Sequence, residues 1–471
     1  ARGGAPPRSL RDTVPETGGR RPVELESAGS DLPATAGTRK VARMDRANVL
    51  IAGGGIVGTS IAWALACRGA GDIVVVDLDL AGVYASSELN AGGVRASWWQ
   101  PVNIATCAAT LDFFRAHRGE FDFRECGYLW LYDDDDRFAC AGRVLGLQNS
   151  FGLAVEVLST AEVCERFPVI DRATDELVGG TLSPRDGLVN PNAVRRWYRR
   201  EAEALGAVFL DRHYIGGVST AHIATSEAAG GRRRVVNVDV AEIASGDATD
   251  TGGAIREILT THRVGAEHVR CESRIRCDVL VNCLGAWSPV FSSKIGVSDV
   301  TEPVRRQIAL VDVHPEDRAP NADFERMGMI VDASNLYFHP EGPYVLAGYS
   351  IPDEPSGYDF AYDGRDFFER CIWPRLGHRS SSFERCGHVR GWAGLYAVTP
   401  DRSGIAGAVA GFENLFEAHS FTGRGVMQSY GIATALADLV IGGRTREVDI
   451  APLARDRFAL RERWVVEELH I

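Results

Sequence analysis

Residues 49–58 read VLIAGGGIVG, and this stretch decides the fold of the 471-residue chain. An uncharged apolar run leads into glycines at positions 53, 55 and 58, which have the spacing G-x-G-x-x-G. Apolar residues then recur at helical spacing over 58–68, and a β-branched run follows at Ile73–Val76. A strand, a glycine turn, a helix and a second strand in this order predict a βαβ unit in a parallel sheet.

The three glycines of this turn each have a separate physical role. Gly53 permits a tight turn, Gly55 lets the backbone approach a pyrophosphate, and Gly58 lets the helix pack closely on the strand. The backbone N–H groups that open the helix, among them those of Ile56 and Val57, are free to bind phosphate oxygens at the positive end of the helix dipole. The pattern therefore predicts a dinucleotide site, with a ligand-free glycine turn as the alternative.

Asp77 ends the second strand, 19 residues after Gly58. A carboxylate at this place accepts hydrogen bonds from an adenosine ribose and disfavours a 2′-phosphate, so we expect NAD or FAD and not NADP. The following loop, residues 85–95, is rich in hydroxyls and small side chains. These suit the second phosphate and the ribityl chain of a flavin, although an ordinary surface loop would have a similar composition.

Composition and charge exclude several other classes of protein. The net charge is 51 − 63 = −12, which argues against nucleic acid or an anionic membrane surface as the main partner. The ten cysteines include no Cys-x-x-Cys pair, so we expect no metal site and a reducing, cytoplasmic compartment. Residues 49–67 carry no charge, but their consecutive glycines argue against a membrane span.

Residues 1–43 differ from the rest of the chain. They are rich in Arg, Gly, Pro, Ser and Thr and have almost no apolar periodicity. We expect a disordered N-terminal extension, with a mitochondrial-type targeting segment as the alternative.

The later elements predict two interleaved domains of α/β class. A helix is expected after Asn190, and the last long helix at 428–441, while 300–350 alternates as antiparallel strands do and 245–253 has the composition of a loose loop. We expect a Rossmann-like FAD-binding domain interleaved with an antiparallel-sheet (α+β) substrate domain. The expected boundaries are 46–97, 187–292 and 386–471 for the first domain, and 98–186 and 293–385 for the second.

Several blocks together carry a resemblance to a known family. Besides the glycine turn, they are 86–95, VNCLGAW at 281–287, TEPVRRQ at 301–307, YFHP at 337–340, WAGLY at 392–396 and SFTGRGVM at 420–427. They resemble the D-amino-acid oxidase superfamily of FAD oxidoreductases. The pattern is nearest to the sarcosine and dimethylglycine dehydrogenases and to the FAD-dependent oxidoreductase-domain proteins that act as respiratory-complex assembly factors. The blocks at 366–376 and 449–458 favour the assembly-factor type.

The resemblance implies that FAD is the cofactor. The residues that it implies for FAD binding are Gly53, Gly55, Ile56, Val57, Gly58, Asp77, Ser86, Ser87, Asn90, Gly92, Gly93, Ile215, Gly285, Trp287, Thr422, Gly423, Arg424, Gly425 and Met427.

The chain also departs from the family in ways that bear on its chemistry. The position of a flavin-tethering cysteine is Gly394, and 85–90 holds no histidine that could serve as a tether, so we expect non-covalent FAD. Leu346 and Met427 stand where pocket lysines are found in monomeric sarcosine oxidase. We therefore expect slow reaction with oxygen, as in a dehydrogenase.

Four residues are the candidates for a role in catalysis. Arg424 would stabilise the negative charge of the reduced flavin, and Arg95 would bind a substrate carboxylate. Tyr337 and Tyr349 would form aromatic walls around an amine, together with Trp98, Trp99 and Trp392. His339 and His419 are possible bases, but a structural role is the alternative for each.

The function expected from these features is oxidation of a C–N bond in a secondary or tertiary amine or an amino acid, by hydride transfer to flavin. One alternative is a flavin-bound assembly or scaffold protein of a respiratory complex without turnover. Another is oxidation of a 2-hydroxy acid on the same fold. The expected partners are thus a small-molecule substrate and an electron acceptor that the sequence does not identify.

Overall fold

The computed structural model describes residues 45–223, 232–244, 248–319, 323–324, 326–459 and 464–469, with the backbone alone at 248–251. The predicted extension 1–43 lies outside these residues. The chain divides after Arg43, and every element below belongs to the unit Met44–Ile471.

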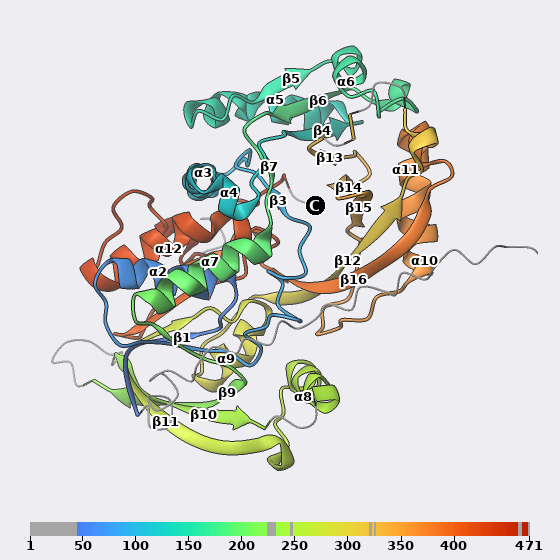
Figure 1. Cartoon of the computed structure of the whole chain (residues 1–471). Coiled ribbons are helices and arrows are strands. Elements are labelled where there is room, and N and C mark those ends of the chain that lie inside the picture. The colour runs from blue at the N-terminus through green and yellow to red at the C-terminus, as the bar shows by residue number, and fades with distance from the viewer. Residues whose placement is uncertain are drawn as a thin grey trace, which may run out of the picture. The chain divides into compact units, whose positions relative to one another are not determined.

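The first sheet is a mixed sheet built around the βαβ unit that the sequence predicts (Figure 1). The central strand, β1, pairs in parallel with both of its neighbours, β11 and β2. The pairs β2–β8 and β11–β18 are also parallel, whereas β17, β10 and β9 pair with their neighbours in the antiparallel direction. The order along the main path is β17 (Ile405–Ala408), β18 (Leu415–His419), β11 (Val269–Asn282), β1 (Arg46–Ala52), β2 (Ile73–Val76) and β8 (Val208–Leu210); β10 (Arg233–Ile243) pairs with β11, and β9 (His213–His222) pairs with β10.

Both faces of β1 are buried, which explains its continuous apolar run. Val49 and Ile51 belong to the core under the helices, whereas Leu50 and Ala52 belong to the core on the opposite face. The helices that pack together over the first face are α2 (Ile56–Cys67), α3 (Pro101–Ala116), α7 (Pro191–Ala204) and α12 (Gly425–Gly442) (Figure 1).

The second sheet is antiparallel except where β13 and β4 pair in parallel. One of its faces packs against α11 (Trp373–Arg379) through Leu376, and the other carries aromatic residues such as Tyr128, Trp130 and Tyr337. Its strands in spatial order are β16 (Gly387–Val398), β12 (Glu302–Asp312), β15 (Tyr344–Tyr349), β14 (Leu336–Glu341), β13 (Met329–Val331), β4 (Tyr128–Tyr132), β6 (Gly179–Ser183) and β5 (Glu156–Leu158).

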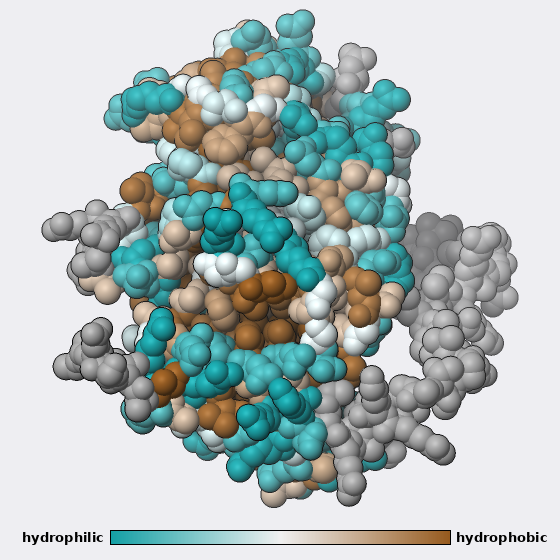
Figure 2. All heavy atoms as spheres, turned by 90° about the vertical axis from the view of Figure 1, so that its left-hand side faces the viewer, coloured by the Kyte–Doolittle hydropathy of each residue, from teal (hydrophilic) through white to brown (hydrophobic). Residues whose placement is uncertain are grey.

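The remaining elements connect or flank the two sheets. They are the short pair β3 (Gly93–Val94) and β7 (Gly187–Leu188), and the helices α4 (Arg118–Phe121), α5 (Asp135–Ser150), α6 (Thr160–Arg166), α8 (Ala248–Thr261), α9 (Ser288–Lys294) and α10 (Arg365–Phe367). In the described ranges no helix has the combination of length and apolar character that a bilayer crossing requires. Figure 2 shows one face of the molecule, where polar residues cover most of the surface and apolar residues gather near the middle.

The predicted α/β class, with one mixed sheet and one largely antiparallel sheet, is confirmed. The helix after Asn190 is present, with the Asn190 side chain accepting from the Ala193 N–H at its start, and the last helix begins at Gly425, three residues before its predicted start. The predicted loop at 245–253 is wrong from residue 248 onward, because 248–261 is helix α8. Ile255 and Ile258 stabilise this helix by packing against Leu78 and Ile243.

Two elements pack with the other domain from the one to which the predicted boundaries assign them. Strand β16 falls in the segment 386–471 that we assigned to the cofactor domain, yet it pairs with β12 of the second sheet. Helix α3 falls in the segment 98–186 that we assigned to the substrate domain, yet it packs against α12 over the first sheet. At β16 and α3 the predicted sequence boundaries therefore differ from the grouping of the elements around the two sheets.

Candidate functional site

A cavity of about 230 Å³ lies at the carboxyl ends of the parallel strands of the first sheet. Residues directly after the ends of β1, β2, β11 and β18 line it: Gly53, Asp77, Cys283 and Ser420 respectively. This edge is where open α/β sheets bind ligands, because loops from neighbouring strands diverge there. The cavity is therefore the candidate cofactor site.

Most of the residues that the sequence suggested for FAD line this cavity. They are Gly53, Gly55, Ile56, Val57, Asp77, Ser86, Ser87, Asn90, Ile215, Gly285, Trp287, Thr422, Gly423 and Gly425. The others, Gly58, Gly92, Gly93, Arg424 and Met427, lie behind the lining.

The glycine turn after β1 has the geometry of a phosphate cradle. Gly53 has a φ of +100°, and a Cβ there would lie 2.5 Å from the Cys283 carbonyl oxygen. A Cβ on Gly58 would lie 1.8 Å from the Gly53 carbonyl oxygen, so this glycine sets how closely α2 approaches the turn. At Gly55 a Cβ would meet only the Ser87 hydroxyl, at 3.8 Å, and no side chain caps α2. The first turn of α2 is thus open to a ligand.

The carboxylate of Asp77 closes the turn from the side of β2. Its Oδ2 accepts from the Gly54 N–H, and its Oδ1 accepts from the Asp79 N–H at 2.7 Å. Burial raises the pKa of Asp77, and these two backbone donors oppose that shift. Each carboxylate oxygen has a second lone pair, which leaves acceptor capacity for a ribose hydroxyl.

The loop after β2 folds over the cavity and is fixed by hydrogen bonds. Ser86 donates to the Leu395 carbonyl of β16 at 2.6 Å, and the side-chain Oδ1 of Asn90 accepts from the Gly92 N–H at 2.6 Å. Gly92 has a φ of +73°, and a Cβ on Gly93 would lie 2.8 Å from the Tyr128 hydroxyl. The buried Ser87 hydroxyl has no hydrogen-bond partner among the described residues.

The loop 420–425 forms the opposite wall and leads into α12. Ser420, Thr422 and Gly423 all have positive φ values, of +61°, +47° and +79°. The Thr422 N–H donates to the Ala397 carbonyl of β16 at 3.1 Å. Positive φ values at Ser420 and Thr422 strain the backbone, and such strain persists only where neighbouring contacts hold the loop, as they do here.

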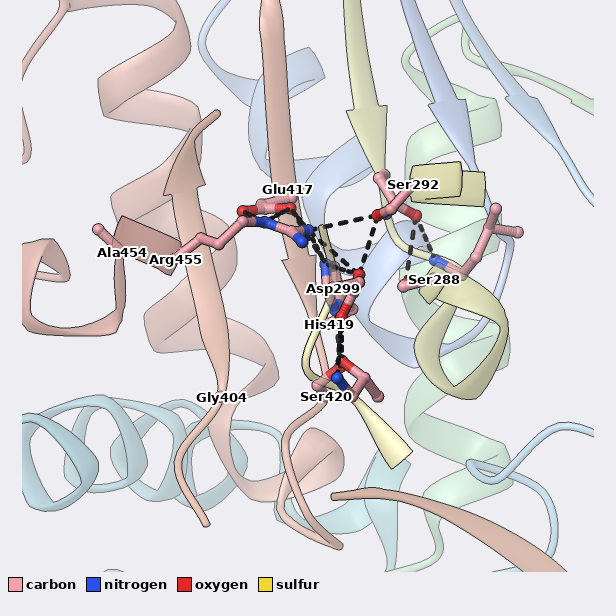
Figure 3. A network of polar contacts seen from close by, with 12 residues as sticks. Ser288, Ser292, Asp299, Gly404, Glu417, His419, Ser420, Ala454 and Arg455 are labelled. Carbon is pink, nitrogen blue, oxygen red and sulfur yellow. Dashed lines mark hydrogen bonds and ion pairs between the residues drawn. The ribbon is translucent and has the colours of Figure 1, made fainter. Parts of the chain in front are cut away.

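A buried polar network holds this loop from behind (Figure 3). The His419 ring lies between the Glu417 carboxylate, 3.2 Å from Nε2, and the Ser420 hydroxyl, 2.6 Å from Nδ1. Ser420 in turn contacts the Thr301 hydroxyl at 2.6 Å, and Thr301 donates to Asp299 at 2.6 Å. His419 and Ser420 both line the cavity, so the network links the cavity wall to the protein interior.

Arg455 supplies positive charge to this network. It donates to Glu417 at 2.8 Å and to Asp299 at 3.2 Å. Burial alone would raise the pKa of both carboxyl groups, but the charges and hydrogen bonds of Arg455 and His419 outweigh it and lower both pKa values. These contacts give His419 a structural role in the wall of the cavity.

Sequence reasoning missed several residues that line the cavity. Lys294 of α9 donates to the Gly216 carbonyl at 3.0 Å, and burial lowers its pKa. Tyr396 comes from β16, Ile258 and Leu259 come from helix α8, and His262 directly follows that helix. In the sequence, residues 392–396 show only a family pattern. The segment of α8 has no helical signal strong enough to predict a helix there.

The four candidate catalytic residues lie in different surroundings. Arg95 and Arg424 are 2% and 1% exposed and flank the Trp98 ring, with guanidinium carbons 3.4 and 4.5 Å from its centroid. Tyr337 lies on the face of the second sheet that carries Tyr128 and Trp130. Tyr349 lies on the other face, under Arg375. Successive residues along a strand point to opposite faces of the sheet, and Tyr349 and Tyr337 therefore lie on different faces. Tyr349 is therefore not close to the cavity.

Other residues named from the sequence have structural partners. Both ring nitrogens of His339 lie within 2.8 Å of backbone carbonyls, those of Pro340 and Ala91. The Trp392 ring donates to the Leu89 carbonyl at 2.9 Å. No group of three or more His, Cys, Asp or Glu side chains suited to a metal ion occurs in the part of the chain that the structure describes.

The fold and the cavity define a dinucleotide-dependent α/β oxidoreductase with a second, antiparallel sheet. Comparison with known proteins identifies the family: the pattern of the FAD dependent oxidoreductase family, DAO, matches residues 48–439. The chain belongs to the DAO family of FAD-dependent oxidoreductases.

Individual relatives are distant. The chain is 27% identical over 451 residues to FAD-dependent oxidoreductase domain-containing protein 1 of Bos taurus, covering 89% of this chain and 86% of that protein. It is 24% identical to a D-amino acid dehydrogenase of Agrobacterium fabrum, covering 88% and 100%. The structure of L-proline dehydrogenase from P. horikoshii superimposes with a TM-score of 0.72 at 20% identity, covering 88% and 99%, which shows a shared fold.

The residues present fit FAD, the cofactor of the family. The open first turn of α2, the Gly55 position without steric neighbours and the unpartnered Ser87 hydroxyl all lie at the cavity. A buried hydroxyl without a partner costs free energy, so a ligand atom in this place would stabilise the fold.

The glycine turn gives a matched test of cofactor binding. Gly55→Ala adds a methyl group that the protein accommodates but a bound pyrophosphate does not, since φ at Gly55 is −65° and its nearest neighbour is 3.8 Å away. We expect the melting temperature of the apoprotein to stay unchanged and FAD affinity to fall about 10- to 100-fold, the cost of one overpacked methyl group. Gly58→Ala should instead lower the melting temperature of the apoprotein itself. Equal FAD affinity in Gly55→Ala and the wild type would contradict this placement.

The Arg455 network predicts a pH-dependent stability. Folded-state pKa values of Asp299 and Glu417 lie below their ordinary 3.8 and 4.5, so their charged forms stabilise the fold above those values, and this stabilisation is lost as pH falls through the folded-state values. Arg455→Met should destabilise the protein by about 3 kcal/mol at pH 7, and this difference should shrink below about pH 4.

Thermal melting of wild type and Arg455→Met at pH 7, 5 and 3.5 measures this difference. Arg365→Met is the control, because Arg365 forms an exposed ion pair with Glu369 and should change stability little at any pH. A loss of stability in Arg455→Met that is the same at all three pH values is the result that disagrees.

Proposed function

We propose that the chain oxidises a C–N bond of an amine or amino acid, as an FAD-dependent dehydrogenase. The observation that carries this proposal is the pair of buried arginines, Arg95 and Arg424. Among the residues that the structure describes, all three guanidinium nitrogens of Arg424 and the Nη1 of Arg95 have no hydrogen-bond partner. A buried cation without a hydrogen-bonded anion is costly, so these groups fit anions that come from outside the chain.

We assign Arg424 to the reduced flavin. It occupies the N-cap position of α12, where the helix dipole already favours negative charge. Burial lowers the pKa of Arg424 to about 10, so the side chain keeps its charge at neutral pH. A full charge and a helix N-terminus together stabilise negative charge that develops during the reaction.

We assign Arg95 to the substrate carboxylate. One of its donors, Nη2, already binds the Leu469 carbonyl at 2.7 Å, which fixes the guanidinium in place. Its Nη1 has no hydrogen-bond partner among the described residues and remains a donor for a ligand, while the Trp98 and Trp130 rings lie 3.4 and 4.5 Å from the guanidinium carbon. A carboxylate held there orients the rest of the substrate.

The surrounding aromatic residues suit a neutral amine. Burial raises the pKa of Tyr337 well above its ordinary value, so the phenol stays neutral. An amine that binds in its neutral form needs no base from the protein. Bound FAD would accept the hydride from the carbon next to nitrogen, and water would hydrolyse the resulting imine.

We further propose that FAD is bound non-covalently and that the protein works in a reducing compartment such as the cytoplasm. Cys283 lines the cavity, but burial raises the pKa of its thiol far above neutrality, which makes it a poor nucleophile. The position that bears a tether in some relatives of similar pattern is Gly394. All ten cysteines are free, in agreement with a reducing compartment.

The flavin spectrum tests the reaction directly. We expect anaerobic holoenzyme to bleach on addition of at least one N-methylated or unmodified amino acid, and acid precipitation of the same holoenzyme to release all of its flavin. Bleaching by 2-hydroxy acids alone would replace amine oxidation with the hydroxy-acid alternative. If neither class of compound bleaches the flavin, turnover is excluded and a scaffold role is favoured.

Arg424 predicts a change in reduction potential. Arg424→Met should lower the two-electron midpoint potential of the bound FAD by about 30–60 mV, because a hydrogen bond to a charged group contributes about 1.5–3 kcal/mol. Arg424→Lys keeps the charge and should recover part of the shift. Spectroscopic titration against a reference dye measures both, and an unshifted potential in Arg424→Met would remove this role.

A further inference from the structure

A third arginine, Arg306 of β12, lies near Tyr396. It is half-buried, and its buried Nε has no hydrogen-bond partner among the described residues. One of its terminal nitrogens donates to the Arg305 carbonyl at 3.0 Å. Burial lowers its pKa, as expected for a cation that is not neutralised.

Tyr396 connects Arg306 to the other two arginines. The Arg306 guanidinium carbon is 5.5 Å from the Tyr396 ring centroid. The Tyr396 hydroxyl lies 2.8 Å from the point where a Cβ on Gly423 would stand, directly beside Arg424. Tyr396 itself lines the cavity, and the charges of Arg306, Arg95 and Arg424 all act on it. Tyr396 is thus the cavity-lining residue on which all three cations act, although none of the three is itself part of the lining.

The acidic groups nearest to these cations are held by other donors. Glu467 accepts from the Trp99 and Gln100 N–H groups, and Asp186 accepts from the Ala96 N–H and the Ser97 hydroxyl. Glu354 pairs with Arg305.

Asp401, the next nearest acid, pairs with Arg457. Among the described residues, none of these four carboxylates hydrogen-bonds to Arg95, Arg306 or Arg424.

These carboxylates keep their negative charge, but among the described residues none of them bonds to the buried Nε of Arg306. The proposed function gives Arg95 the substrate carboxylate and Arg424 the reduced flavin, and Arg306 remains. We propose that the substrate is an amino acid or amine that carries a second carboxylate, and that Arg306 binds it. This inference rests on the proposed function, because it names the substrate class of the same site.

The side-chain positions support binding from the second sheet. Arg306 pairs with Gly394 and Val304 pairs with Tyr396, so both side chains, Arg306 and Tyr396, point to one face. Tyr337 lies on that face as well, and its interaction with the Arg306 charge places the two near each other. A carboxylate between Arg306 and these phenols would receive charge-assisted hydrogen bonds.

Unreactive acids test the site without turnover. Titration of the holoenzyme with succinate and with propionate, at constant ionic strength, is followed by the flavin absorption spectrum. We expect succinate to bind about 30-fold more tightly than propionate, the effect of one added charge-assisted hydrogen-bonded pair. Arg306→Gln should reduce this preference to about threefold or less, and Arg306→Lys should restore part of it.

Turnover separates this inference from the proposed function. We expect N-methylaspartate to have a lower KM than N-methylalanine, and Arg306→Gln to remove that difference by raising the KM for N-methylaspartate. Equal binding of succinate and propionate, with N-methylalanine oxidised as well as N-methylaspartate, overturns the second-carboxylate assignment and leaves amine oxidation standing. If no amine reduces the flavin, both proposals fail.

Discussion

The close backbone contact between Gly53 and Gly58 sets how β1, α2 and the end of β11 meet at the cavity. Any side chain at position 58 would overlap the Gly53 carbonyl, and any side chain at 53 would overlap the Cys283 carbonyl. Only glycine lets β1, α2 and the end of β11 meet so closely. This approach brings the open first turn of α2 to the edge where the parallel strands end, and so creates an anion site from backbone alone.

The rest of the site is electrostatic and comes from side chains far apart in sequence. Arg95 follows the loop after β2, Arg306 lies on β12, and Arg424 starts α12. The fold brings these cations together around Trp98 and Tyr396 in the interior, where charge is expensive. Donors on all three lack hydrogen-bond partners among the described residues, which is the observation behind the proposal that they bind anions.

The network of Arg455, Glu417, His419 and Asp299 shows how strain near the cavity is supported. Its buried charges are paired, in contrast to those of the three arginines. The hydrogen bond between His419 and Ser420 holds a residue with positive φ at the start of the loop that leads into α12. The stability of this wall therefore comes from ion pairing behind it and not from the loop itself.

The sequence by itself determined the βαβ unit, the glycine roles and the dinucleotide class of cofactor, because these follow from local spacing and backbone geometry. It also indicated Arg95 and Arg424 as candidates from the chemistry of their side chains. It could not show that Tyr349 faces away from the site, that α8 is a helix covering the cavity, or that β16 joins the second sheet.

Those features were decided by the tertiary structure, because they require knowing which residues far apart in sequence share a face. The convergence of Arg306 with the other two arginines is of the same kind. Strand pairing between β12 and β16 fixes the side of the sheet to which Arg306 points. Packing then buries the Arg306 Nε without a hydrogen-bond partner among the described residues. Burial is a property of packing that no local sequence pattern contains.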